Sequence, residues 1–121
     1  MPYSEIFKDH IANPRGIGDL PDADVVAEET NPVCGDRLRL SLRFRGEIIE
    51  KASFLAYGCA PTLACGSILT QMLDGLSKEK AAQITRHDII DELGGLPGRK
   101  HHAAALAIET LRSALTLPIA R

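Results

Sequence analysis

The sequence is notable first for what it does not contain. It has no apolar run long enough to span a membrane, and its first ten residues lack the apolar core of a signal peptide. It has no excess of basic residues, because 14 Lys and Arg stand against 16 Asp and Glu, and this balance argues against a nucleic-acid partner. It has only three cysteines, an odd number that does not fit a disulfide framework. We therefore expect a cytoplasmic protein, away from membranes, whose thiols serve chemistry or packing.

The composition is that of an ordinary folded domain. Apolar residues make up 45% of the chain and charged residues 25%, as in globular proteins generally. A length of 121 residues supports one hydrophobic core but is short for two. Since no repeat, low-complexity tract or linker divides the chain, we expect a single domain over residues 1–121.

The clearest local pattern is an alternation of apolar and polar residues over positions 37–45. Leucine or phenylalanine stands at every second position, with arginine or serine between, which predicts a strand with one buried face. A tight connection at Arg45-Gly46-Glu47 leads into a second apolar stretch, so residues 37–57 are predicted to form a β-hairpin.

Elsewhere, periodicity mainly indicates helices. The expected elements are helices over 3–11, 61–74, 78–84, from Thr85 or Asp88 to 93, and over 100–115, with a short strand over 24–30. These elements predict an α+β fold in which helices pack on one face of a small antiparallel sheet.

Three side chains with metal-binding chemistry flank the predicted hairpin. Cys34 and Asp36 precede it and Cys59 follows it, and in an antiparallel pair these two points lie at the same end. Two soft thiolates with a carboxylate suit iron–sulfur units or zinc. The alternative is structural: two small buried thiols at strand ends, with Asp36 bonding within a turn.

Two further residues are candidates for the same site. His102 lies near the start of the last helix and imidazole binds metals, but helical spacing groups it with Leu106 and Ser113 on a solvated flank. Cys65 lies on the apolar face of its helix, which favours a core thiol. It also lies close enough to Cys59 for a short movement to bring both sulfurs to one site.

Four segments together resemble a known family, the U-type iron–sulfur cluster scaffolds (IscU, the N-terminal domain of NifU, and the related SufU). The segments are DHIANPR at 9–15, NPVCGD at 31–36, YGC at 57–59 and LPGRKHH at 96–102. They occur in the family's order, with similar spacings, over nearly the whole chain. The resemblance implies an IscU/NifU-like fold with a three-stranded antiparallel sheet and helices packed on it.

The resemblance also implies a function, that of a scaffold rather than an enzyme. A cysteine desulfurase would pass sulfur as a persulfide to a scaffold cysteine, iron would join it, and a labile [2Fe–2S] cluster would be built and handed to recipient apoproteins. By position, Cys34 and Cys59 resemble the family's cysteine ligands, Asp36 the carboxylate that keeps the cluster labile, and His102 its histidine.

The chain departs from the family at two places. Ala103 stands where the family has a third cysteine, directly after the histidine. Either Cys65 supplies the missing sulfur, or Cys34, Asp36, Cys59 and His102 form a four-ligand shell, which also suits zinc. Which cysteine accepts the persulfide is also left undecided, because the family's third cysteine is the one replaced here.

The second departure is in residues 96–100. This segment lacks the second proline and the valine of the family segment that a dedicated Hsp70-type chaperone binds, which argues against that partner. Two other functions stay open: a zinc-dependent sulfur acceptor of the SufU kind, loaded by a cysteine desulfurase, and a scaffold fold kept as a binding module without metal turnover. The chain resembles SufU at Cys34–Arg37 but lacks the long insertion expected after Cys59.

Overall fold

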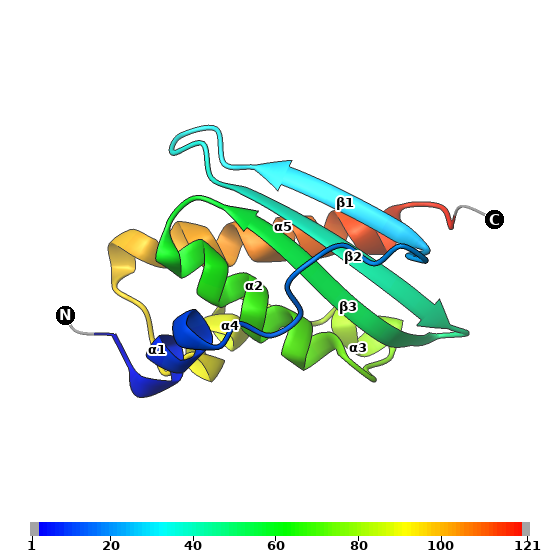
Figure 1. Ribbon diagram of the computed structural model, residues 1–121, viewed down its shortest axis with the longest axis horizontal. Helices are drawn as coiled ribbons and strands as arrows, with labels where there is room; N and C mark the ends of the chain where they lie inside the picture. The colour runs from blue at the N-terminus through cyan, green and yellow to red at the C-terminus, as the bar shows by residue number, and fades with distance from the viewer. Residues whose placement is uncertain (1–2, 120–121) are drawn as a thin grey trace.

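The computed structural model describes residues 3–119 and has the α+β architecture expected from the sequence (Figure 1). Its elements are α1 (Glu5–Ala12), β1 (Val25–Thr30), β2 (Arg37–Arg45), β3 (Ile48–Tyr57), α2 (Ala60–Leu73), α3 (Lys78–Ala81), α4 (Arg86–Glu92), the 3-10 turn η1 (Gly98–Lys100) and α5 (His101–Thr116). The strands form an antiparallel sheet in the order β1-β2-β3. No helix within residues 3–119 is both long enough and apolar enough to cross a membrane.

The predicted β-hairpin is confirmed as β2 and β3. Leu38, Leu40 and Leu42 are fully buried on the face that packs against the helices, as the alternation predicted. In the register of the two strands, Arg37 lies opposite Tyr57. The chain therefore enters the hairpin after Asp36 and leaves it at Gly58 at the same end of the sheet.

The other face of the sheet is less open than the polar alternation suggested. The connection between α1 and β1 crosses this face on its way to the far strand (Figure 1). Asp19 on this connection lies 3.3 Å from Arg39, and Asp22 lies 2.8 Å from Arg43. Acidic side chains therefore neutralise much of the arginine-rich strand, and Ser41 between these arginines is buried.

Helix α2 is buried on nearly all sides, whereas its pattern predicted one apolar face. It packs against β3, α1, α4 and α5, so even its small residues are enclosed. Gly66 faces the ring of Phe54 so closely that a methyl group there would overlap the ring. This close approach of helix and strand explains why small residues line α2.

The helix boundaries follow the capping chemistry. Ser4 accepts a hydrogen bond from the N–H of Phe7 at 3.0 Å and starts α1, and Thr85 forms a capping box with Asp88 at the start of α4. The last helix begins at His101 rather than at residue 100, because the 3-10 turn η1 precedes it. The predicted helix over 78–84 is only one turn, α3.

Candidate metal centre

Three chain segments meet at one end of the sheet, at the left of Figure 1. They are the loop between β1 and β2, the turn from β3 into α2, and the first turn of α5. Each segment carries at least one of the side chains that the sequence singled out.

The loop before β2 is shaped by Asn31. Its side-chain oxygen accepts the N–H groups of Val33 at 2.9 Å and Cys34 at 3.4 Å, and its carbonyl accepts the N–H of Gly35 at 2.8 Å. Gly35 has a φ of 79°, which an L residue rarely adopts. The resulting bend leaves Cys34 exposed and turns Asp36 inward, where only 8% of it is accessible.

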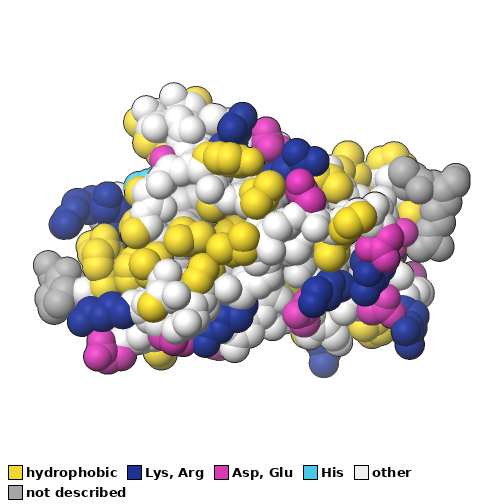
Figure 2. Space-filling view, in the orientation of Figure 1, with side chains coloured by type: hydrophobic (Ala, Val, Ile, Leu, Met, Phe, Trp, Pro, Cys, Tyr) yellow, Lys and Arg dark blue, Asp and Glu magenta, His cyan; other side chains and the backbone are white. Residues whose placement is uncertain are grey.

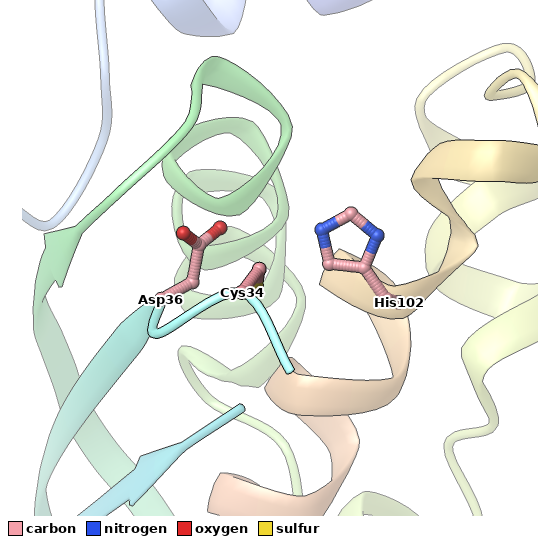
Figure 3. Close-up of side chains that lie close together, drawn as sticks. All are labelled: Cys34, Asp36 and His102. Atoms are coloured by element: carbon pink, nitrogen blue, oxygen red, sulfur yellow. The ribbon is translucent and has the colours of Figure 1, made fainter. Parts of the chain in front are cut away.

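Cys34, Asp36 and His102 form a compact group of ligating side chains (Figure 3). One ligand atom of each lies within 4.8 Å of the other two. The Nδ1 of His102 lies 3.1 Å from the carbonyl of Arg99, which can only accept, so Nδ1 carries the proton and donates it. In the neutral ring, Nε2 then keeps its lone pair for a metal.

Cys59 is the N-cap residue of α2 and adjoins this group through Asp36. Its Sγ donates to Asp36 Oδ2 at 3.0 Å, and its backbone N–H points to the same oxygen at 3.4 Å. The structure therefore brings Cys59 to the carboxylate, although Cys59 is outside the compact group as described.

The carboxylate of Asp36 is held by several donors. Besides Cys59, the hydroxyl of Thr62 donates to Oδ2 at 2.7 Å. Burial acts to raise the pKa of Asp36, but the hydrogen bonds from Cys59 and Thr62 outweigh it, so the pKa lies below its ordinary value. The charged form, which binds metals, is the form that these donors stabilise.

Cys65, His10 and His101 are not part of this compact group. Cys65 is fully buried in the core, and burial together with the nearby Cys59 raises the pKa of its thiol to about 12. Its surroundings match the core interpretation of this residue. His10 is buried against Ser67, with 2.6 Å between Nδ1 and Oγ, and His101 reaches the carbonyl of Leu96.

The four side chains at this end fit a metal or a metal cluster in their donor chemistry. They offer two sulfurs, one imidazole nitrogen and one carboxylate oxygen, a set that suits zinc or iron. Ala103, where a third thiol would stand, is fully buried and offers only a methyl group.

Sequence reasoning missed Thr62. It looks like an ordinary residue in the first turn of a helix, and it lies 26 positions from the carboxylate that it contacts. Its place three residues after Cys59 was the available signal, because a side chain there stays near the helix N-terminus.

Comparison with known proteins identifies the family of the chain. The family model of the NifU-like N-terminal domain matches residues 2–117. The chain is 41% identical to the iron-sulfur cluster assembly scaffold protein IscU 1 of Archaeoglobus fulgidus, covering 93% of this chain and 74% of that protein. It is 38% identical to the IscU scaffold of Escherichia coli, covering 95% and 92% of the two chains.

Solved structures show the same fold. The N-terminal NifU-like protein from Brucella abortus superposes with a TM-score of 0.72 at 18% identity, covering 93% of this chain and 90% of that chain. A SUF-system scaffold from Fervidobacterium islandicum gives a TM-score of 0.70 at 22% identity, covering 94% and 96%. On the family match over nearly its whole length, this chain belongs to the family of NifU-like N-terminal domains.

Proposed function

We propose that this protein is a scaffold on which iron–sulfur clusters are assembled. It takes up iron and sulfur at Cys34, Asp36, Cys59 and His102, and passes the assembled cluster to recipient apoproteins. The observation that carries the proposal is the meeting of Cys34, Asp36 and His102 within 4.8 Å, in a chain whose relatives are named as such scaffolds.

The exposure of the site suits transfer better than storage. Cys34 lies on an exposed loop beside Val33, which is 94% accessible, so a partner can reach the thiol. Figure 2 shows hydrophobic side chains gathered over the first part of α2, next to this end of the sheet, which offers an area for protein contact. The partners of this proposal are a cysteine desulfurase, which supplies sulfur as a persulfide, and the recipient apoproteins.

The mixed set of ligands suits a cluster that is bound temporarily and then released. Iron–sulfur clusters are held most firmly by four thiolates, and this site offers two, with a hard carboxylate and an imidazole. The protein contributes ligation and positioning, and the desulfurase carries out the chemistry on cysteine, so no enzymatic activity is assigned to the scaffold itself. A reducing compartment such as the cytoplasm would keep its thiols free.

The test begins with protein purified without oxygen and supplied with ferrous iron, cysteine, a cysteine desulfurase and dithiothreitol, which reduces the persulfide sulfur to sulfide. We expect a visible absorbance band and about two iron and two acid-labile sulfides per cluster, as in a [2Fe–2S] unit. Cys34→Ser should lose the cluster, whereas Cys65→Ser, the matched control, should keep it. The cluster should then pass to an apo-ferredoxin.

Three results would contradict the proposal. Bound zinc without sulfide, and without uptake of iron in the presence of the desulfurase, would indicate a zinc-dependent sulfur acceptor instead. A folded protein that takes up neither metal would indicate a binding module. Loss of the cluster in Cys65→Ser but not in Cys34→Ser would show that Cys65, and not Cys34, is the sulfur ligand.

A further inference from the structure

We propose that Thr62 is a positioning residue of the metal centre, whose hydroxyl holds the carboxylate of Asp36 where it can bind a metal together with Cys34 and His102. The inference rests on the proposed function only in requiring that this site bind a metal ion. It assigns a role to a residue on α2 that offers no ligand itself.

The carboxylate of Asp36 sits in a fitted niche. Its Oδ2 accepts hydrogen bonds from Thr62 Oγ1 at 2.7 Å and from Cys59 Sγ at 3.0 Å. The carboxylate also lies against Gly58, which has a φ of 145°, so that a methyl group at Gly58 would overlap it. The side chain is therefore confined by hydrogen bonds and by this close contact.

The niche holds the carboxylate in its ligating position. In the same conformation that is bonded to Thr62, a carboxylate oxygen of Asp36 lies within 4.8 Å of ligand atoms of Cys34 and His102. The hydrogen bond and the approach to a metal are therefore compatible. Loss of the hydroxyl should free the carboxylate to turn away and weaken metal binding.

Thr62 is the donor that persists when a metal binds. A thiol that ligates a metal gives up its proton, so Cys59 then stops donating to Asp36. Thr62 keeps its proton, and its hydroxyl lies nearer to Asp36 Oδ2, at 2.7 Å, than to the second acceptor in reach, Cys59 Sγ at 3.5 Å. Thr62 is also fully buried, with its backbone N–H bonded to the carbonyl of Cys59 at 3.1 Å. Its hydroxyl thus remains the side-chain donor to Oδ2.

The other buried threonines in helices use their hydroxyls differently. Thr70 faces two backbone carbonyls, that of Ser67 at 2.9 Å and that of Arg15 at 3.0 Å, and Thr110 donates to the carbonyl of Leu106 at 2.8 Å. The acceptors of both hydroxyls are therefore backbone carbonyls, as is common for threonines inside helices. Thr62 instead reaches a side chain 26 positions away, on another segment.

The test measures zinc affinity by competition with a chromophoric chelator, for wild type, Thr62→Val, Thr62→Ser and Asp36→Ala. Outer-shell partners of ligands typically change metal affinity by 10- to 100-fold, so Thr62→Val should bind zinc about 10-fold more weakly. Thr62→Ser keeps the hydroxyl and should restore affinity. In the Asp36→Ala background, Thr62→Val should have no further effect.

Cobalt(II) spectra of the same proteins give a second readout. Thr62→Val should shift the ligand-field bands toward those of Asp36→Ala, which a loss of stability alone would not do. Thr70→Val is the matched control, because it removes a buried hydroxyl from the same helix and should leave zinc affinity unchanged. Thr62→Ala replaces Thr62→Val if the valine variant does not fold.

The outcomes separate the inference from the proposed function. An equal loss of affinity from Thr62→Val with and without Asp36 would overturn the inference, as would a wild-type protein that binds no zinc. If instead the zinc results follow the expectation but no cluster forms with the desulfurase, the scaffold function fails and the role of Thr62 stands.

Discussion

Residues 58–62, which lead into α2 and form its first turn, and residues 65–70 within the helix use similar side chains for different purposes. Three pairs make the comparison: Gly58 with Gly66, Cys59 with Cys65, and Thr62 with Thr70. At the start of the helix, all three residues contact the carboxylate of Asp36 or would collide with it if enlarged. In the middle, their partners are an aromatic ring, the apolar core and backbone carbonyls.

The difference shows that environment, rather than residue type, assigns these roles. The start of a helix leaves backbone N–H groups unpaired, so charged and polar groups gather there. The middle of a helix pairs its own backbone N–H groups, so its side chains here meet the apolar core and polar groups of α1 and the segment after it. Substitutions in the first turn should therefore change metal binding, and equivalent substitutions in the middle should change only stability.

The largest effect is expected from the glycine pair. Gly58→Ala introduces a methyl group into the Asp36 carboxylate at a φ of 145°, so we expect zinc affinity to fall by more than about 10-fold. Gly66→Ala introduces one into the ring of Phe54 and should cost about 1–3 kcal/mol of unfolding free energy, with unchanged zinc affinity.

Chelator competition and denaturant unfolding measure the two quantities on both variants. If Gly66→Ala weakened zinc binding as much as Gly58→Ala, the division of α2 into a metal-binding turn and a structural middle would be wrong. If Gly58→Ala bound zinc like wild type, the carboxylate would not be held by the niche.

Much of this arrangement was predictable from the sequence. The alternation over residues 37–45 predicted the hairpin, and antiparallel pairing then predicted that Cys34, Asp36 and Cys59 lie at one end. These inferences succeed because they depend on the backbone alone. The buried side of β2 follows from the same period of two.

Side-chain relations across segments could not be predicted in this way. The helical spacing of His102 placed it on a solvated flank, yet the turn η1 and the bond from Nδ1 to Arg99 aim its ring at Asp36. No spacing rule links Thr62 to a carboxylate on another strand. The connection between α1 and β1 covers the arginine-rich face of the sheet through ion pairs such as that of Asp22 with Arg43, and the periodicity of the strands does not predict such pairs.

The next largest effect is expected from Cys65, whose thiol should make the free energy of unfolding depend on pH in the alkaline range. Burial raises the pKa of Cys65 from its ordinary 9.0 to about 12, so the folded protein keeps the proton that the unfolded chain loses. The resulting stabilisation is complete below pH 9 and is lost as the pH rises toward 12. At pH 10.5, the loss should be about 2 kcal/mol, from 1.36 kcal/mol per pKa unit.

Unfolding of wild type and Cys65→Ala at pH 8 and pH 10.5 checks this expectation. The wild type should lose about 2 kcal/mol more than the variant between the two values. The variant also loses the packing of the Cys65 sulfur in the core. The difference in unfolding free energy between the two proteins at pH 8 measures this loss, and it is subtracted from the difference at pH 10.5. Identical pH dependence in the two proteins would show that Cys65 is not enclosed in the core, and would reopen it as a ligand.

The smallest effect is expected from Asp36 in acid, measured on metal-free protein. The pKa of Asp36 lies below its ordinary 3.8, so its contribution to stability is present above that pH and is lost as the pH falls below it. The effect is smaller than that of Cys65, because burial opposes the hydrogen bonds that stabilise the charge. Asp36→Asn should therefore flatten the acid limb of the stability curve, and Asp91→Asn, at an exposed position on α4, serves as the control. An unchanged acid limb in Asp36→Asn would mean that the first turn of α2 does not favour the charged carboxylate.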